Sequence, residues 1–194
     1  MAYLNLASIR LCTESEGPGR RFAIWVQGCH RRCDGCCNPE MQEMRKNIIV
    51  NTADLTDLIA SSRVNNQIEG VTFVGGEPFL QAEGCAEIAS WCKQHGLSVL
   101  AFSGFLYEEL KEMGNTHVNA FLRSLDVLVD GPFVSELYDY ERDWIGSKNQ
   151  KVWYFTDRYD NSIERTSNRI SCFGYGNTDK WMAILIHVTL KSPT

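Results

Sequence analysis

The stretch RFAIWVQGCHRRCDGCC, residues 21–37, joins an apolar segment directly to a loop that is dense in cysteine. Residues 22–26 carry the branched and aromatic side chains that strands favour, and Gly28 marks the point where this segment ends. Four of the eight cysteines of the chain follow within nine residues. The stretch therefore predicts a strand that runs into a cysteine-rich loop.

Segments of the same kind recur along the chain and alternate with segments of helical periodicity. Strands are predicted at residues 4–11, 71–74, 97–102 and 126–129, and helices at 52–59, 81–95, 106–113 and 118–122. Glycine-rich turns follow several of the strands, as in Gly75-Gly76-Glu77-Pro78. Strands that alternate with helices favour an α/β fold with mostly parallel strands. A complete eight-fold barrel needs about 250 residues, so the 194 residues here predict a partial, open (βα) barrel.

The pattern changes after Lys151. Residues 151–155 and 182–190 are predicted to be strands, whereas residues 157–180 are polar and rich in Asn, Ser, Thr and Gly. We therefore expect a core at residues 1–156 and a short C-terminal extension at 157–194, with its strands packed on or near the core.

The composition is that of a folded, water-soluble protein. Apolar residues make up 44% and charged residues 22%, with a net charge of −5. A basic nucleic-acid-binding protein is disfavoured because phosphate neutralisation needs a surplus of positive charge. No apolar run approaches the roughly 18 residues of a membrane span, and the first residues lack a secretory signal. We expect a cytoplasmic protein that binds neither nucleic acid nor a membrane.

The cysteine spacing Cys29-x₃-Cys33-x₂-Cys36 indicates a metal or redox site, since neighbours this close would constrain little chain as disulfides. Structural zinc would want four protein ligands, and no second ligand pair is present. A [4Fe-4S] cluster with three cysteines leaves one iron open to a substrate. Cys37 is expected to pack rather than to serve as a fourth ligand, because adjacent residues of an extended chain point in opposite directions. Cys85 and Cys92 are expected on the core face of a helix.

These motifs together resemble the radical S-adenosylmethionine superfamily. The resemblance covers roughly residues 5–156 and rests on the three-cysteine loop after one strand and GGEP after another. Further motifs narrow it to the activating proteins of anaerobic ribonucleotide reductase and related glycyl-radical activases: Gly17-Pro18-Gly19 with Arg21, Asn38, Asp126–Gly131 and Gly146–Gln150. Two departures concern Cys37, where these activases often carry an aromatic residue, and the segment from Asp157 onward, which does not match.

The resemblance implies two cofactors and the residues that hold them. Cys29, Cys33 and Cys36 would bind a [4Fe-4S] cluster, whose open iron would be chelated by S-adenosylmethionine. The residues implied to contact S-adenosylmethionine come from several turns: Gly35, Cys36, Cys37, Gly75, Gly76, Glu77, Pro78, Ser103, Gly104, Asp130 and Asn149. No catalytic residue is expected beyond the cluster and S-adenosylmethionine, because the cofactors carry the difficult chemistry.

The resemblance also implies partners and a reaction. A 5′-deoxyadenosyl radical from reductive cleavage of S-adenosylmethionine would abstract a hydrogen atom, generating a glycyl radical on a large partner enzyme, anaerobic ribonucleoside-triphosphate reductase. The electron would come from a donor such as flavodoxin or ferredoxin. Two alternatives stay open: a radical enzyme that modifies a peptide or small metabolite, and a non-catalytic electron carrier or zinc module.

Several residues have plainer interpretations. Glu77 could cap the helix that follows it, since acidic groups are favoured there, and His30 is expected to be a solvated loop residue. Arg20, Arg21, Arg31 and Arg32 are expected around the cysteine loop, either steering an anionic partner or simply solvated.

Overall fold

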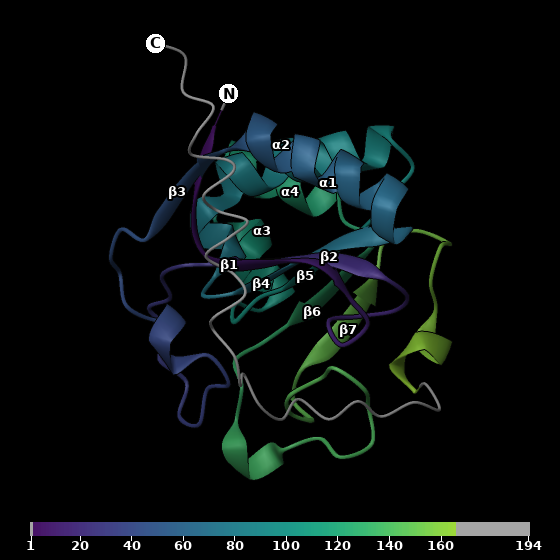
Figure 1. Cartoon of the computed structure of the whole chain (residues 1–194). Helices are drawn as coiled ribbons and strands as arrows, with labels where there is room; N and C mark the ends of the chain where they lie inside the picture. The colour runs from purple at the N-terminus through teal and green to yellow at the C-terminus, as the bar shows by residue number, and fades with distance from the viewer. Residues whose placement is uncertain (1, 166–194) are drawn as a thin grey trace.

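The computed structural model describes residues 2–165. Its strands and helices occur in the mixed order that the sequence predicts (Figure 1). The strands are β1 Tyr3–Thr13, β2 Arg21–Val26, β3 Ile48–Asn51, β4 Gly70–Gly75, β5 Ser98–Phe102, β6 Val127–Asp130 and β7 Lys151–Tyr154. The α-helices are α1 Thr52–Asn66, α2 Ala82–Gln94, α3 Tyr107–Glu112 and α4 Thr116–Arg123. Short 3₁₀ helices are η1 Pro39–Met41, η2 Pro78–Gln81, η3 Ser135–Leu137 and η4 Asn161–Glu164.

One seven-stranded sheet organises the described chain, in the order β3-β1-β2-β4-β5-β6-β7. The central pairs β2–β4, β4–β5 and β5–β6 are parallel. Antiparallel pairs flank them, because β1 pairs with both β2 and β3, and β7 pairs with β6. The expected mixed α/β fold with a mostly parallel sheet is confirmed, whereas its closure toward a barrel stays a prediction.

Two features of the elements differ from the sequence-based expectation. Strand β3 was not predicted; it pairs with β1 and leads directly into α1. Helix α1 continues beyond the predicted end at Ile59 as far as Asn66. Residues 60–66 contain neither Gly nor Pro, so nothing in the chain stops the helix earlier. The strand predicted at 182–190 lies outside the described residues.

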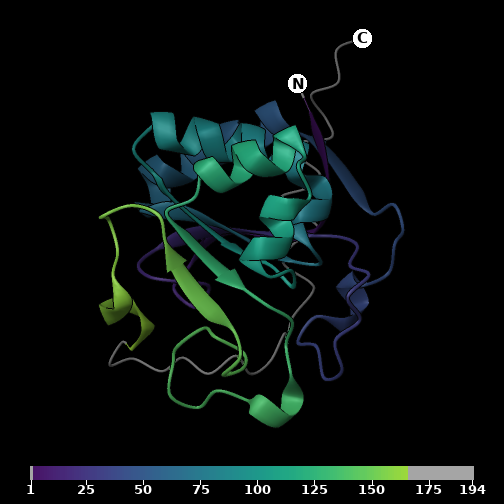
Figure 2. The same ribbon diagram turned by 180° about the vertical axis from the view of Figure 1, so that it is seen from behind.

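The helices cover one face of the sheet, as Figures 1 and 2 show for α1, α2 and α4. Alternate strand residues point into this layer, so Ile24, Phe73 and Ala101 are fully buried in its core. Cys85 and Cys92 lie in the same core, as predicted for the apolar face of α2. Among residues 2–165, no helix combines the length and the apolar character that crossing a membrane requires.

The opposite face of the sheet is covered differently. Ala23 and Trp25 of β2 point to this side, where they pack with Met41 of η1. The described segments on this side are mainly loops, including residues 131–150 and the segment around η4 (Figures 1 and 2). Among the described residues, helices thus cover one face of the sheet and mainly loops cover the other.

Arg21 was expected near the cysteine loop, and this expectation is wrong. Its side chain is fully buried at the start of β2, at the opposite end of that strand from Gly28. Nε donates to Thr72 Oγ1 at 2.5 Å, Nη1 to Ser98 Oγ at 2.9 Å and Nη2 to the Val71 carbonyl at 2.7 Å. The guanidinium thus ties the amino ends of β2, β4 and β5 together through neutral acceptors.

Replacing Arg21 with Lys should destabilise the fold. Lysine cannot reproduce the planar fork of donors, so buried acceptors on Thr72, Ser98 and Val71 would lose their partners. We expect Arg21→Lys to lower the free energy of unfolding by about 2–4 kcal/mol, measured by urea unfolding. The control Arg20→Lys changes a neighbouring, half-buried arginine and should be near neutral. Equal stability of the two variants would contradict this role for Arg21.

Candidate functional site

The three predicted ligand cysteines lie on the loop between β2 and η1. The base of this loop is fixed by backbone hydrogen bonds from Gly28 to the Met41 carbonyl (2.8 Å) and from Cys29 to the Gln42 carbonyl (3.1 Å). Within the loop, the Cys36 N–H donates to the Cys33 carbonyl at 3.3 Å across a turn in which Gly35 has φ +68°. Cys29, Cys33 and Cys36 are each half-buried and form no disulfide.

Burial raises the pKa of the Cys29 thiol, and the charges of Glu77 and Cys33 add to this effect, while hydrogen bonds from the Arg31 and Arg32 backbone oppose it. Without a bound cation, the neutral thiol is therefore favoured. Because a metal-bound cysteine is a thiolate, cluster binding at Cys29 would release a proton.

The three thiols of the cysteine loop are of the type that binds the irons of an iron–sulfur cluster. Three unbridged, half-buried thiols share one short loop that starts at a fixed strand end. Within residues 2–165, however, no three His, Cys, Asp or Glu side chains are already gathered closely enough to hold a metal ion.

The expectation that Cys37 packs is wrong, because its side chain is exposed. The premise of an extended chain does not hold there: residues 34–35 form a turn and residue 37 a bend. His30 is exposed, as expected.

The Gly75-Gly76-Glu77-Pro78 turn lies directly against the start of the cysteine loop. Gly76 N–H donates to the Val26 carbonyl at 2.8 Å, and Glu77 N–H donates to the Gly28 carbonyl at 2.9 Å. A Cβ atom on Gly76 would stand 2.4 Å from the Gly28 carbonyl oxygen, which is closer than real Cβ contacts. Gly76 is thus required by the close approach of two backbones.

Glu77 carries a buried carboxylate at the centre of this region. It accepts hydrogen bonds from Phe79 N–H (3.0 Å), from Ser103 Oγ (3.1 Å) and from Gly104 N–H (2.7 Å). The first of these confirms the predicted helix cap, here at the start of η2. Burial raises the pKa of Glu77 to about 7, although these hydrogen bonds and the charge of Arg31 lower it in part.

Arg31 links the cysteine loop to the turn between β5 and α3. Its guanidinium carbon lies 4.2 Å from the centre of the Phe105 ring, and Nη2 forms an ion pair with Glu109. A Cβ atom on Gly104 would stand 3.0 Å from Arg31 Cγ. Arg31 was expected either to steer an anionic partner or to be solvated, and neither expectation included this packing. No spacing pattern in the sequence links residue 31 to residues 104–109.

Asp130 and Asn149 adjoin the same region through backbone contacts. Asp130 is buried and accepts a hydrogen bond from Tyr107 N–H at 2.7 Å, at the start of α3. Asn149 is exposed and donates to the Pro132 carbonyl at 2.7 Å. Their roles toward S-adenosylmethionine remain predictions.

Phe133 is a contact residue that the sequence analysis missed. Its ring lies 3.4 Å from the position of a Cβ on Gly35 and 2.9 Å from that of a Cβ on Gly146. The segment 133–147 therefore touches the cysteine loop. The position of Phe133 directly after the Asp130-Gly131-Pro132 turn is the signal that could have revealed it.

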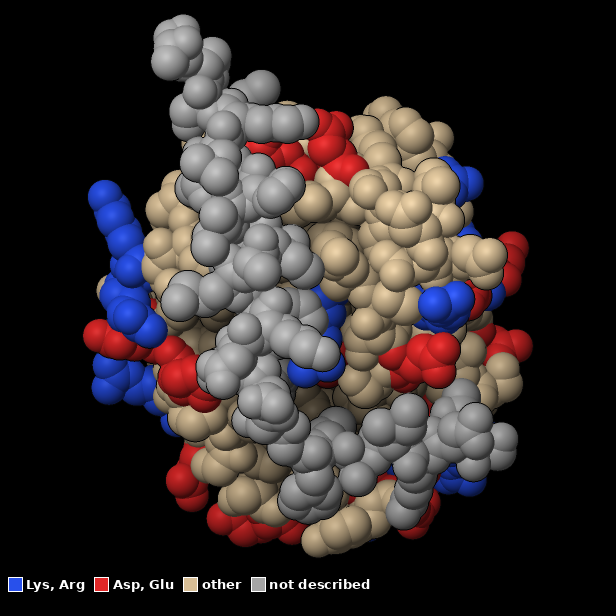
Figure 3. All heavy atoms as spheres, viewed as in Figure 1, with Lys and Arg blue, Asp and Glu red and all other residues tan. Residues whose placement is uncertain are grey.

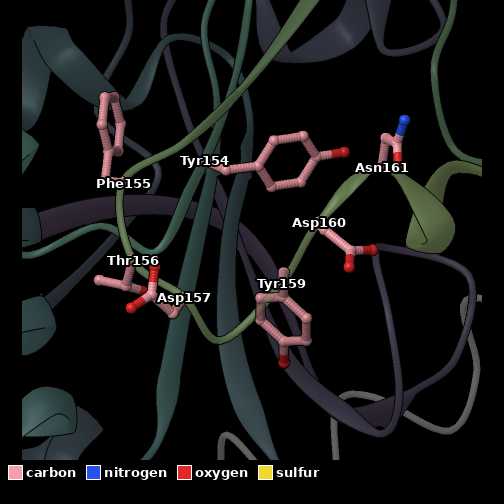
Figure 4. A pocket seen from close by; sticks show the side chains of 7 residues that line it. All are labelled: Tyr154, Phe155, Thr156, Asp157, Tyr159, Asp160 and Asn161. Carbon is pink, nitrogen blue, oxygen red and sulfur yellow. The ribbon is translucent and has the colours of Figure 1, made fainter.

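A cavity of about 640 Å³ lies elsewhere, and Figure 4 shows the seven residues that line it. They belong to the segment 154–161, which begins at the last residue of β7. Tyr154 pairs with Val127 at the start of β6, so this cavity lies at the amino ends of the parallel strands. It contains none of the predicted site residues, and the contacts around Glu77 identify the site better than this hollow does.

Comparison with known proteins supports the same assignment. A family model described as a 4Fe-4S single cluster domain matches residues 15–153. Three relatives each bear the name anaerobic ribonucleoside-triphosphate reductase-activating protein. The relative from Enterobacteria phage T4 is 28% identical over 79% of this chain and 96% of its own. Those from Salmonella typhi and Vibrio cholerae are 32% and 31% identical, over 70% and 72% of this chain and 89% and 91% of their own.

A crystal structure of QueE from Escherichia coli overlaps part of the fold. It covers 53% of this chain and 52% of its own, with a TM-score of 0.41 and 16% identity.

The family match spans most of the described chain and includes all three cysteines that are predicted to bind the cluster. The family match and the relatives together confirm the expected [4Fe-4S] cluster and S-adenosylmethionine as cofactors. They also confirm the expected enzyme class, that of radical S-adenosylmethionine enzymes. The chain belongs to the 4Fe-4S single cluster domain family and to the family of anaerobic ribonucleoside-triphosphate reductase-activating proteins.

Proposed function

We propose that this protein generates a glycyl radical on an anaerobic ribonucleoside-triphosphate reductase, using a cluster held by Cys29, Cys33 and Cys36. The observation that carries this proposal is the contact between the start of the cysteine loop and the Gly76–Glu77 turn. Through this contact the three-thiol loop begins directly beside a turn whose glycine backbone packs against it. Relatives named as activators of such a reductase support the choice of partner over a peptide or small metabolite.

When bound, the cluster and S-adenosylmethionine supply reductive cleavage of the C5′–S bond, which yields methionine and a 5′-deoxyadenosyl radical able to take a hydrogen atom from a glycine Cα. The protein supplies orientation and shielding. Gly75, Gly76 and Pro78 would present backbone groups to the methionine moiety. Gly35, the Cys36–Cys37 main chain and Asn149 would flank the nucleoside.

The buried groups of the site would hold these turns in place. Glu77 fixes the Ser103–Gly104 turn by accepting two hydrogen bonds from it, and Asp130 fixes the start of α3. Ser103 and Gly104 would line the cofactor cavity beside the Gly76 turn. All of these groups lie at the carboxyl ends of β4, β5 and β6, where a parallel sheet places its ligands.

The surroundings of the core complete the proposal. We expect the sheet to form a partial barrel, with residues 1–156 as the core and 157–194 as an extension packed on or near that core. The described part of the extension supports its packing on the core. Tyr159 Oη lies 2.9 Å from Ser98 Oγ, and Arg158 Nη1 donates to the Gly96 carbonyl at 3.0 Å.

We also expect a cytoplasmic protein that takes its electron from flavodoxin or ferredoxin and binds neither nucleic acid nor a membrane. The charged side chains of the described residues visible in Figure 3 are of both signs and are interspersed with uncharged surface. Such a surface supports a protein partner over a polyanion.

Removing one ligand should abolish the chemistry. In Cys33→Ala, two remaining thiolates cannot hold the cluster well, so iron, sulfide and 5′-deoxyadenosine formation with dithionite should all fall to background. The matched control is Cys37→Ala, which changes an exposed neighbouring thiol and should keep the cluster. Cleavage of S-adenosylmethionine retained in Cys33→Ala would refute the ligand assignment, and zinc without iron or sulfide would refute the radical chemistry.

The partner assignment predicts an electron paramagnetic resonance signal. The anaerobically reconstituted protein, mixed with the reductase, dithionite and S-adenosylmethionine, should produce a glycyl-radical doublet on the reductase. Abundant 5′-deoxyadenosine without a doublet on any reductase would instead favour a peptide or small-metabolite substrate.

Titration of Glu77 should make stability depend on pH. Its pKa of about 7 in the fold lies above the ordinary value of 4.5, so the fold favours the protonated acid. This stabilisation is complete below the ordinary pKa and is lost as the pH rises through 7. Glu77→Gln stays neutral throughout.

Between pH 5 and pH 8, the free energy of unfolding of the wild-type protein should therefore fall relative to that of Glu77→Gln, by up to about 3 kcal/mol. Urea unfolding at four pH values, without S-adenosylmethionine, measures this difference. A constant offset between the two curves would show that Glu77 does not titrate in this range.

A further inference from the structure

Side-chain contacts with one aromatic ring hold the middle of the cysteine loop. His30 and Arg31, which lie between Cys29 and Cys33, both pack on the ring of Phe105. The His30 ring meets it edge-to-face with centroids 5.7 Å apart, and the Arg31 guanidinium carbon lies 4.2 Å from its centre. Phe105 therefore supports the part of the loop that separates the first two predicted cluster ligands.

Arg31 is held by charge as well as by packing. Its Nη2 forms an ion pair with Glu109, and the two side chains are 24% and 43% exposed. The oxygen that pairs with Arg31, Glu109 Oε2, also accepts a hydrogen bond from Leu106 N–H at 2.6 Å. The backbone at the start of α3 thus positions the carboxylate that Arg31 contacts.

The backbone beside Arg31 is strained. Arg32 is exposed and has a φ of +49°, in the left-handed region that residues other than glycine rarely adopt. Such a conformation costs free energy and persists where the surrounding structure enforces it. Here the enforcing contacts lie on both sides: Arg31 packs on Phe105, and the Cys33 carbonyl accepts a hydrogen bond from Cys36 N–H at 3.3 Å.

We propose that Arg31 and Glu109 are positioning residues for the cluster: their ion pair keeps the cysteine loop ordered and thereby slows loss of the cluster. The inference rests on the three ligand cysteines of the proposed function. A loop that is already ordered loses less conformational entropy when it binds its cofactor, so the cofactor is held more tightly. The contact from α3 supplies that order from outside the loop.

The test measures release of the cluster in the absence of the reductase. Holoenzyme reconstituted with iron and sulfide is treated with excess EDTA under anaerobic conditions, and the decay of the cluster absorbance gives the release rate. In Glu109→Gln the amide oxygen can still accept the hydrogen bond from Leu106, but the charge that attracts Arg31 is gone. Release should be about three times faster, as expected for loss of a partly exposed ion pair.

Glu108→Gln is the matched control. Glu108 is the neighbouring residue on α3, and its exposed carboxylate pairs with Lys111 at 2.6 Å instead of with the cysteine loop. This variant removes the same charge from the same helix. It should release the cluster at the wild-type rate.

Variants of Arg31 distinguish an ion pair from a general loss of packing. Arg31→Gln removes both the ion pair and the cation on the Phe105 ring, so release should be about ten times faster. Arg31→Lys keeps the positive charge and should recover most of the wild-type lifetime of the cluster. The double variant of Arg31→Gln with Glu109→Gln should be no faster than Arg31→Gln alone, because Glu109 acts through Arg31.

A second measurement examines the loop without the cluster. In the apoprotein, hydrogen exchange of the Cys29 and Cys36 amides, which both donate hydrogen bonds in the fold, should be faster in Glu109→Gln than in the wild-type protein. Exchange in the central strand β4 should be unchanged. This pattern would report local opening of the loop rather than a weaker fold.

Three results would overturn the proposal: equal release rates in Glu109→Gln and Glu108→Gln, additive effects in the double variant, or unchanged exchange of the loop amides in Glu109→Gln. In each case, a wild-type protein that holds iron and sulfide through the three cysteines leaves the proposed function standing. A wild-type protein that binds no cluster through these cysteines would overturn both.

Discussion

The close approach of two backbones, at Gly76 and Gly28, is the constraint on which the site depends. Here the end of β4 meets the first residue of the cysteine loop, and the oxygen of Gly28 occupies the space that a side chain on Gly76 would need. Parallel pairing of β2 with β4 brings the two strand ends level, with Val26 opposite Gly75. The register of the sheet therefore sets where the cysteine loop begins. That register is fixed in turn by the strand side chains that pack against the helices on one face of the sheet.

The turn from Ser103 to Glu109 connects the remaining parts. This turn donates two hydrogen bonds to the Glu77 carboxylate. Arg31 stacks on its Phe105 ring and forms an ion pair with its Glu109 carboxylate. Glu109 also accepts a hydrogen bond from Leu106 N–H at 2.6 Å, so the same carboxylate caps α3 and holds the cysteine loop. A change in the conformation of this turn would therefore disturb both the cysteine loop and the Gly75-Gly76-Glu77-Pro78 turn.

Much of this arrangement could be predicted from the sequence because its signals are local. The apolar run 22–26, the glycines at 75–76 and the cysteine spacing each reside in a few consecutive residues. By contrast, Arg21 and Arg31 are placed by contacts with residues about 50 to 80 positions away, which no single-sequence pattern reveals. Cys37 was misjudged because its backbone bends, and β3 was missed because four residues paired at an edge carry little periodicity.

The cavity beside Tyr154 and the cysteine loop lie at opposite ends of the same strands. The sheet between them separates the proposed cluster loop from a surface where Asp157 and Asp160 are exposed to solvent. A fluorophore or affinity handle introduced at Asp157 would thus report on this molecule, or immobilise it, while leaving the reactive end free to face another enzyme.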